Sequence, residues 1–231
     1  MPRLYLFAEG QTEQTFADTV LKPHLTNFGV YMHNPVLIAH ARKKGTVHRG
    51  GGRKYLPMKS DIVRFLKQDT AGDAFFTTMI DLYALHSEFP GREEAEKLRN
   101  DPYRRVNLLH EAWTTDVGDR RFIPFIQLHE YEAYLFTDVT QFELFYPNSE
   151  AEIAALKKIA DHVSTPELID DGQHTAPSKR IIGQLPDYAA AKKVVGPQVG
   201  ELIGLAAIRK KCSHFDKWLT RLERLGSIGT S

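Results

Sequence analysis

The chain has 231 residues, 42% of them hydrophobic and 26% charged, and its 30 Lys and Arg residues nearly balance its 29 Asp and Glu residues. These values are those of an ordinary globular protein that can bury a sizeable core, and the charge balance argues neither for nor against nucleic acid as a ligand. The only cysteine, Cys212, excludes a disulfide framework and a cysteine-based zinc site. No segment has the pattern of a signal peptide, and no apolar run approaches the roughly 20 residues that cross a bilayer. We therefore expect a soluble protein of the cytoplasm with no role at a membrane.

The N-terminal part of the sequence predicts strands that alternate with helices. Residues 3–8 are apolar and are followed by Glu9 and Gly10, which predicts a buried strand and a tight turn. Thr12 is expected to cap the helix that comes next. The other expected strands cover residues 30–40, 74–80 and 121–128, and the expected helices cover residues 12–25, 58–69 and 91–100. Such alternation predicts right-handed crossovers and a mainly parallel sheet.

From residue 138 onward the hydrophobic period is helical throughout. We therefore expect an α/β domain over residues 1–137 and a helical C-terminal extension over residues 138–231. Three tyrosine and phenylalanine residues just before that boundary, Tyr131, Tyr134 and Phe136, are expected to face the core rather than to stack on bases. Cys212 is expected to be a buried residue at the end of a helix.

Acidic residues follow three of the four predicted strands. Glu9 ends the first, Asp81 ends the third, and Glu130 and Glu132 follow the fourth. Because the carboxyl ends of parallel strands share one edge of a sheet, these side chains are expected to converge there. Carboxylates at close range repel unless they bind protons or share a cation, and oxygen ligands favour Mg²⁺ or Mn²⁺ over zinc.

Each acid also has a structural interpretation. Glu13 lies in the first turn of a helix, where the helix dipole favours an acid. Glu130 and Glu132 would point in directions about 200° apart on one helix, which favours Glu130 as a ligand and keeps Glu132 as the alternative. His86 and His129 are candidate proton-transfer groups or additional metal ligands, and the sequence identifies no partner for either.

A glycine-rich basic segment lies between Ala41 and Tyr55 and contains no acid. Its glycines allow backbone amides to approach a phosphate closely, although the segment is not a Walker A motif. The alternative is a solvated loop without a ligand. Two further cations, Lys179 and Arg180, are expected to begin a helix, where positive charge opposes the helix dipole. The residues expected to contact a nucleic-acid backbone are Arg42, Lys43, Lys44, Arg49, Arg53, Lys54, Lys179 and Arg180.

The segment EGQTE, residues 9–13, and the segment IDLYALHSEFPG, residues 80–91, resemble the Toprim domain of topoisomerases, primases and overcoming-lysogenization-defect nucleases. The resemblance implies that Glu9 acts as general acid/base or metal ligand, that Glu13 is a second acid, and that Asp81 is the first aspartate of an Asp-x-Asp pair. Tyr83 stands where that family has its second aspartate. Either Glu130 or Glu132 then replaces that carboxylate, or metal binding is weak or lost.

The whole chain more closely resembles the prokaryotic family called domain of unknown function 4276, which is regarded as Toprim-like. The matching segments are EGQTE, TTMIDLYALHSEFPG, FIPFIQLHEYEAYLF, TAPSKRI and IRKKCSHFDKWL. Genes of that family tend to lie beside ATPase genes of phage-defence and mobile elements, which implies an ATPase partner. The resemblance implies a Toprim-like α/β fold with a mainly parallel sheet flanked by helices and a C-terminal helical extension.

The acids and the basic segment together predict a Mg²⁺- or Mn²⁺-dependent enzyme that cleaves phosphodiester bonds, most simply a nuclease. Its expected catalytic residues are Glu9, Glu13 and Asp81, and its expected metal ligands are Glu9, Asp81, Glu130 and Glu132. One alternative is a non-catalytic or conditionally active partner of an ATPase, which Tyr83 favours. Another is a hydrolase of nucleotide phosphates. The sequence does not distinguish DNA from RNA as the substrate.

Overall fold

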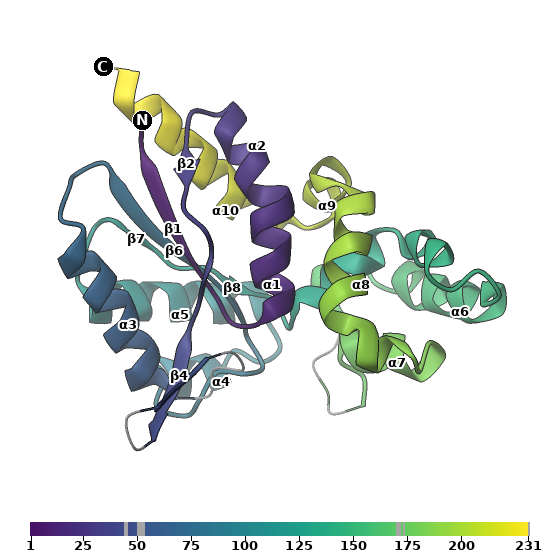
Figure 1. Ribbon diagram of the computed structural model, residues 1–231. Coiled ribbons are helices and arrows are strands. Elements are labelled where there is room, and N and C mark those ends of the chain that lie inside the picture. The colour runs from purple at the N-terminus through teal and green to yellow at the C-terminus, as the bar shows by residue number, and fades with distance from the viewer. Residues whose placement is uncertain (44–45, 50–53, 170–171, 173, 231) are drawn as a thin grey trace.

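A mainly parallel β-sheet forms the centre of the protein (Figure 1), as the sequence predicts. The computed structural model describes residues 1–43, 46–49, 54–169, 172 and 174–230. Strand β1 (Arg3–Ala8) lies next to β6 (Ala74–Asp81), and all pairings within this sheet are parallel. Strands β2 (Tyr31–Met32) and β3 (Val36–Leu37) pair with β1, and strands β7 (Phe122–Ile123) and β8 (Ile126–Gln127) pair with β6. A separate antiparallel hairpin consists of β4 (Ala39–Lys43) and β5 (Thr46–Arg49).

The expected strands over residues 30–40 and 121–128 are each interrupted near a proline. Pro35 separates β2 from β3, and Pro124 separates β7 from β8. A proline has no N–H to donate to the ladder, so it breaks the regular pairing. At the second break the Thr78 hydroxyl accepts a hydrogen bond from the Phe125 N–H (2.8 Å) and donates one to the Phe125 carbonyl (2.9 Å). A side chain thus replaces the missing ladder contacts.

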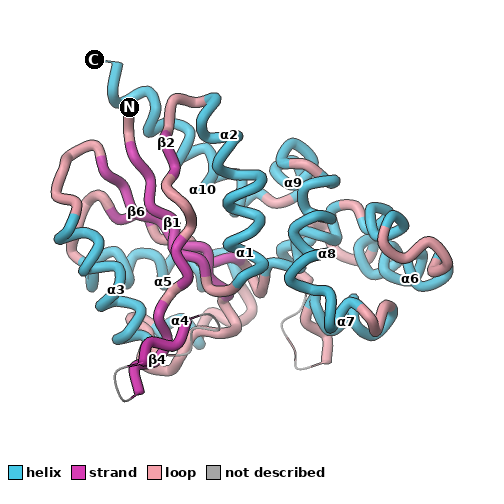
Figure 2. Tube along the Cα trace, in the orientation of Figure 1, coloured by secondary structure: helices cyan, strands magenta, loops and turns pink. Residues whose placement is uncertain are grey.

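Helices cover both faces of the sheet (Figures 1 and 2). One face packs against α3 (Tyr55–Gln68), α4 (Arg92–Glu96) and α5 (Pro102–Val117). The other face packs against α1 (Gln11–Phe16), a π-helical turn (Ala17–Leu21), α2 (Lys22–Asn27) and α10 (Ser213–Glu223). Alternate residues of β1 and β6 supply the two cores, since neighbouring side chains of a strand point to opposite faces.

The C-terminal part is helical, as expected, and most of it forms a group beside the sheet (Figure 1). Its α-helices before α10 are α6 (Glu150–Asp161), α7 (Pro177–Gln184), α8 (Tyr188–Ile203) and α9 (Leu205–Lys211). Segments of 3₁₀ helix cover Tyr131–Thr137, Val139–Leu144, Pro166–Leu168 and Arg224–Thr230. Helix α10 returns to the sheet, where the Trp218 ring stacks on Phe125 with centroids 4.2 Å apart. In the part of the chain that is described, no helix is long and apolar enough to cross a membrane.

Several expected helix boundaries differ from those of the structure. The first helix begins at Gln11 with Gly10 as its N-cap, so the expected capping role of Thr12 is wrong. The Glu13 carboxylate instead accepts a hydrogen bond from the Gly10 N–H (3.0 Å), because an acid three residues into a helix can reach back to the cap. The segment expected to be helical over residues 91–100 is an α-helix only between Arg92 and Glu96.

The buried residues confirm two smaller predictions. Tyr131, Tyr134 and Phe136 are at most 1% exposed and belong to the core. Cys212 is buried at the C-terminal end of α9.

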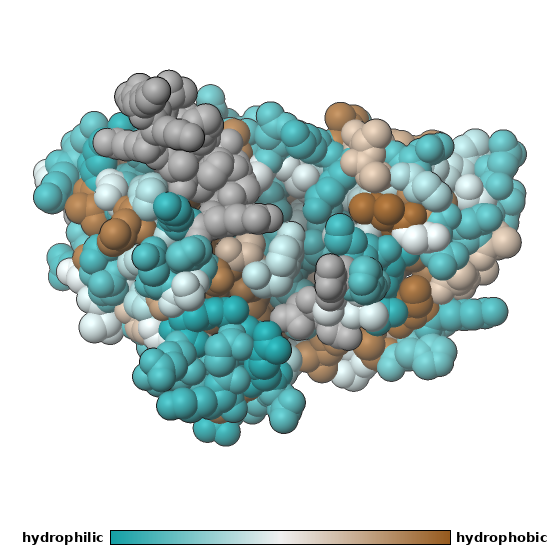
Figure 3. Space-filling view, turned by 90° about the horizontal axis from the view of Figure 1, so that it is seen from below, coloured by the Kyte–Doolittle hydropathy of each residue, from teal (hydrophilic) through white to brown (hydrophobic). Residues whose placement is uncertain are grey.

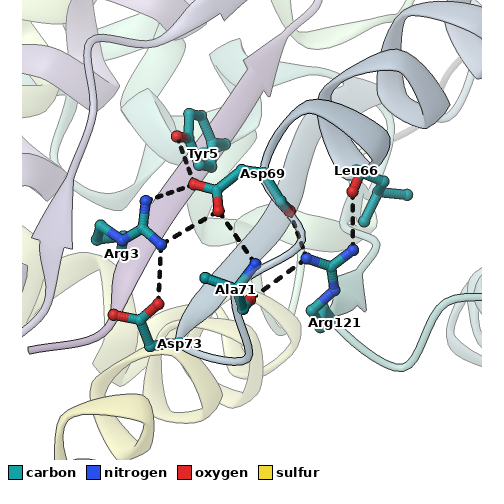
Figure 4. A network of polar contacts seen from close by, with 7 residues as sticks. All are labelled: Arg3, Tyr5, Leu66, Asp69, Ala71, Asp73 and Arg121. Carbon is teal, nitrogen blue, oxygen red and sulfur yellow. Dashed lines mark hydrogen bonds and ion pairs between the residues drawn. The ribbon is translucent and has the colours of Figure 1, made fainter.

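A polar network fixes the end of the sheet at which β1 begins (Figure 4). Arg3 forms ion pairs with Asp69 and Asp73, and the Tyr5 hydroxyl donates to Asp69 (2.9 Å). The Arg121 guanidinium donates to backbone carbonyls at the end of α3, including that of Leu66 (2.9 Å). This network joins β1, the α3–β6 connection and the start of β7, and it leaves the opposite end of the sheet for the acids.

Candidate functional site

Three polar side chains meet at the carboxyl ends of β1, β6 and β8. Glu9 directly follows β1, and its Oε2 accepts a hydrogen bond from the Asp81 N–H (2.8 Å). Asp81 is the last residue of β6, and its Oδ1 accepts a hydrogen bond from Gln127 Nε2 (2.5 Å). Because β1, β6 and β8 are neighbours in parallel register, their ends bring together residues that are far apart in sequence. The predicted meeting of Glu9 and Asp81 is therefore present.

Glu13 reaches the same place from the first turn of α1. Its Oε2 accepts from the Gly10 N–H, and its Oε1 accepts a longer contact from Gln127 Nε2 (3.4 Å). A Cβ atom at residue 10 would lie 2.9 Å from Glu13 Oε2, so a glycine leaves the room that this carboxylate needs. The EGQTE segment thus places both of its acids at the end of the sheet.

Glu130 and Glu132 approach from the segment after β8. Glu130 has an extended backbone and precedes the 3₁₀ helix, so the argument that the two side chains diverge along one helix does not apply. Its carboxylate accepts hydrogen bonds from the backbone N–H and the hydroxyl (3.0 Å) of Ser178, at the start of α7. Glu132 accepts from the Tyr188 hydroxyl (3.2 Å) and pairs with Lys192 Nζ (3.0 Å), both on α8. His129 turns the chain into this segment with a left-handed φ of 66°, an uncommon conformation for a residue other than glycine.

The five acids are buried, each with at most 8% of its surface exposed. Burial, together with the negative charge of Glu13, raises the pKa of Glu9 to about 8. Burial and the charges of Glu9 and Glu13 also raise the pKa of Asp81 well above its usual range. Burial raises the pKa of Glu132 to about 7, although the nearby Lys192 ammonium opposes the change. The site therefore lacks positive charge for its number of carboxylates.

Lys192 contributes positive charge to the site. Burial opposes its charged form, but the charges of Glu132 and Glu130 outweigh burial and raise the pKa of Lys192. The sequence interpretation missed Lys192, Gln127 and Ser178. Lys192 had a detectable signal, because it lies one helical turn after Tyr188 on the face of α8 that also buries Val195 and Val199.

The donor chemistry fits a hard divalent cation, although the acids are not arranged around one. Among the described residues, no group of three or more His, Cys, Asp or Glu side chains is placed to hold a metal ion. Hydrogen bonds from Asp81 N–H, Gly10 N–H and Ser178 hold three of the carboxylates instead. Two buried oxygen atoms, Glu132 Oε2 and Gln127 Oε1, have no hydrogen-bond partner in the part of the chain that the structure describes. Buried acceptors without donors are rare, and a cation or an ordered water satisfies such atoms.

Glu9, Glu13, Asp81, Glu130 and Glu132 form the acid cluster, and Tyr83 lies near it. The tyrosine is 47% exposed, and its N–H makes a long contact to the His129 carbonyl (3.5 Å). Burial of the hydroxyl and the charges of Asp81 and Glu130 raise the pKa of Tyr83. The position that holds an acid in the Toprim pattern therefore remains beside the acids but supplies a neutral hydroxyl.

The expected basic residues that the structure describes lie in three regions: the β4–β5 hairpin, the position before α3, and the start of α7. Arg42 and Lys43 lie in β4, Arg49 lies in β5, and Lys44 and Arg53 lie outside the described residues. Exposed Lys54 lines a small pocket together with Glu9 and His86. His86 is half-buried and lies near Glu88 (Nδ1 to Oε2, 3.4 Å).

Two of the expected cations flank the acid cluster on the other side. Lys179 is exposed in the first turn of α7, next to the Ser178 that binds Glu130. Arg180 donates to the Thr175 carbonyl. Figure 3 views the molecule from the end at which β1 and β6 finish, and hydrophilic residues alternate there with smaller hydrophobic patches among the residues drawn in colour.

Comparison with known proteins gives one family and one solved structure. The model of the family described as "Domain of unknown function (DUF4276)" matches residues 8–223. The chain is similar to the C-terminal region of the Burkholderia pseudomallei OLD protein, with 14% identity, a TM-score of 0.45, and coverage of 98% of this chain and 99% of that one. No curated protein matches the sequence.

Proposed function

We propose a function for this chain, which belongs to the DUF4276 family. The proposal is based on the acids at the carboxyl end of its sheet. The proposed function is metal-dependent cleavage of phosphodiester bonds in nucleic acid, most simply as a Toprim-like nuclease. The observation that carries the proposal is the convergence of five buried acids with Lys192, in which charge repulsion and burial raise the pKa values of Glu9 and Asp81.

A divalent cation, Mg²⁺ or Mn²⁺, would have to draw Glu9, Asp81 and Glu132 together, with Glu130 beside them, and would then polarise a phosphate and stabilise the leaving oxygen. Glu13 orders the turn at Gly10 and so positions Glu9. Gln127 orients Asp81 through its amide. Lys192 offsets the charge of Glu132 and supplies an ammonium group to a bound phosphate. Burial of the cluster excludes water that would weaken these interactions.

The basic residues around the site suit a nucleic-acid backbone. Lys54 and Lys179 are exposed on two elements that flank the acids, and Arg42, Lys43 and Arg49 belong to the hairpin. Such side chains neutralise phosphates without reading the sequence of bases. Lys44, Arg53 and Arg180 complete the set of proposed backbone contacts.

The test is cleavage of labelled DNA and RNA with Mg²⁺ or Mn²⁺, compared with a reaction that contains a chelator. Glu9→Gln and Asp81→Asn are expected to reduce cleavage at least about 100-fold, because each removes a carboxylate charge from the site. Glu94→Gln, which changes an exposed acid of α4, is the matched control and retains activity. Equal cleavage by the wild type and both site variants would overturn the proposal. Measuring phosphate release from nucleotides tests the alternative that the protein is a hydrolase of nucleotide phosphates.

A second candidate is a non-catalytic or conditionally active partner of an ATPase, as the family resemblance implies. Two observations favour it: Tyr83 replaces an acid, and among the described residues no three acids are arranged around a metal position. Calorimetric titration with Mg²⁺ and Mn²⁺, with and without DNA, separates the two candidates. Binding that Asp81→Asn abolishes favours the enzyme, whereas no binding at millimolar metal favours the partner.

A further inference from the structure

A pocket with a polar rim lies at the edge of the sheet, and none of its lining residues belongs to the acid cluster. This edge pocket has a volume of about 160 Å³ and is lined by Asn107, His110, Ile123, Pro124, Phe125, His214, Lys217, Trp218 and Arg221. It forms where α5 and α10, which cover opposite faces of the sheet, both reach the break between β7 and β8 (Figure 1). Its floor is apolar, and its exposed rim is formed by Asn107, Lys217 and Arg221.

The two histidines of the edge pocket bind the backbone N–H and carbonyl of one residue of the strand. The Ile126 N–H donates to His110 Nε2 (2.9 Å), and His214 Nε2 contacts the Ile126 carbonyl (2.9 Å). An N–H group can only donate, so His110 Nε2 must be the unprotonated nitrogen of a neutral ring and Nδ1 must carry the hydrogen. No hydrogen-bond partner of His110 Nδ1 is present among the residues that the structure describes. His110 therefore offers a fixed N–H donor where it lines the pocket.

The other polar groups of the edge pocket are cationic or neutral. Lys217 and Arg221 lie one turn apart on α10, and neither forms an ion pair with another described residue. Neighbouring Asp216 does not compensate them, because it pairs with Arg209. Glu167 is near Lys217 but does not line the pocket, and its carboxylate accepts the N–H groups of His214 and Phe215. Two positive charges thus face a hollow whose lining contains no carboxylate.

We propose that the edge pocket is a phosphate-binding site. A phosphate offers only acceptor oxygens, and the pocket supplies the complementary donors: the Arg221 guanidinium, the Lys217 ammonium, the Asn107 amide and the Nδ1–H of His110. The phosphate is either free, as inorganic phosphate or a mononucleotide, or part of a nucleic-acid strand. This inference does not depend on phosphodiester cleavage at the acid cluster.

Two consecutive residues of β8 connect the edge pocket to the acid cluster. His110 and His214 hold Ile126, and the next residue, Gln127, donates to Asp81 and Glu13. A nucleic-acid strand bound along this edge of the sheet would place one phosphate in the pocket and another near the acids.

The experiment uses the full chain with ¹⁵N-labelled histidine in a phosphate-free buffer that contains a chelator. Three probes are titrated separately: sodium phosphate, adenosine monophosphate and a short single-stranded DNA. We expect a saturable shift of the His110 Nδ1 resonance. The double variant Lys217→Gln/Arg221→Gln is expected to bind at least about tenfold more weakly, because it removes two charge-assisted contacts. The double variant Lys67→Gln/Lys158→Gln removes two exposed charges outside the pocket and binds like the wild type.

The three probes distinguish the sources of phosphate. Shifts with sodium phosphate or the mononucleotide support a site for a free phosphate, and shifts with DNA alone support a contact to a strand. The inference is overturned if no probe moves the His110 resonance at concentrations up to about 10 mM. It is also overturned if the double variant at Lys217 and Arg221 binds as the wild type does. Circular dichroism of each variant verifies that its fold is intact.

Discussion

Lys192 illustrates how one residue stabilises the acid cluster. Its ammonium pairs with Glu132, and it lies within electrostatic range of Glu9 and Asp81. We expect Lys192→Met to lower the free energy of unfolding by about 1–3 kcal/mol at pH 8, because it leaves buried carboxylates without a compensating charge. At pH 5 the loss should be smaller, since Glu9 and Glu132, with pKa values of about 8 and about 7, are then protonated. Chemical denaturation in metal-free buffer measures both values.

The neighbouring lysine provides the control for that prediction. Lys193 is exposed on the same helix, so Lys193→Met should change stability by less than about 0.5 kcal/mol at either pH. An equal loss for Lys192→Met at pH 5 and pH 8 would contradict the electrostatic role and indicate lost packing instead.

Glu9 gives the acid cluster a defined pH dependence. Its pKa is about 8 in the folded protein against a usual value near 4.5, so between these values the folded state holds a proton that the unfolded state has released. Stability contributed by this group is therefore lost as pH rises from about 5 to about 8. We expect the midpoint of thermal unfolding, measured with a chelator, to fall over that range, and Glu9→Gln to reduce the fall.

The same measurement with Mg²⁺ tests the proposed metal site. A cation that binds the ionised acids stabilises the folded state, and it does so more at pH 8 than at pH 5, because fewer protons then compete with it for the carboxylates. The expected result is a larger increase in the midpoint at pH 8 than at pH 5. A Mg²⁺ effect of equal size at both values, or one retained in Asp81→Asn, would argue against binding at the acid cluster.

At the scale of the element, the break between β7 and β8 depends on two histidine side chains. Burial lowers the pKa of His110 to about 3 and that of His214 to about 4, so both rings are neutral when they bind Ile126. Their polar contacts occupy backbone groups of an edge strand that would otherwise be available to another chain. We expect His214→Ala to cost about 1–3 kcal/mol at pH 7.5, through a lost hydrogen bond and lost stacking on Phe125.

The cost of His214→Ala should shrink as the pH falls. The wild type must keep His214 neutral while the unfolded chain protonates its histidines near pH 6.5, so the wild type loses stability below that value, by at most about 2 kcal/mol per ring at pH 5. The variant loses less, because it lacks that ring. Urea denaturation at pH 7.5 and pH 5 measures the difference, and His174→Ala in an exposed turn is the control. A pH-independent cost would show that the neutral ring is not required.

At the scale of the whole molecule, the α/β part and the C-terminal helices share one core. Leu4 and Leu6 of β1 belong to the same cluster of buried residues as Phe215 and Leu219 of α10. The Trp218 indole also donates to the Thr77 hydroxyl on β6 (2.9 Å). The division into residues 1–137 and 138–231 remains a proposal about organisation, and the shared core indicates that the two parts fold together.

Truncation tests this cooperation. A fragment of residues 1–137 would expose the face of the sheet that α10 covers, so we expect it to lack a cooperative thermal transition and to aggregate. A chain that ends at residue 226 keeps α10 and should unfold cooperatively. A sharp transition for the short fragment would show that residues 1–137 form an independent domain.

The sequence by itself determined the features that depend on neighbouring residues. The apolar runs ended by Glu9 and Asp81 predicted parallel strands and the meeting of those acids, because strand ends in such a sheet always share one edge. Helical periodicity predicted the C-terminal helices, and residue type predicted the burial of Tyr131, Tyr134 and Cys212. These signals are local, so they survive without knowledge of how the elements pack.

Only the tertiary structure decided which distant groups complete the site. Ser178 and Lys192 reach Glu130 and Glu132 because α7 and α8 pack beside the end of the sheet, and no local pattern encodes that crossing. The break at Pro124 is bridged by Thr78, which lies on another strand. Glu13, not Thr12, binds the cap because the geometry at Gly10 admits its carboxylate. Each of these contacts joins groups whose separation depends on the packing of whole elements, and that packing is set by the core rather than by the residues in contact.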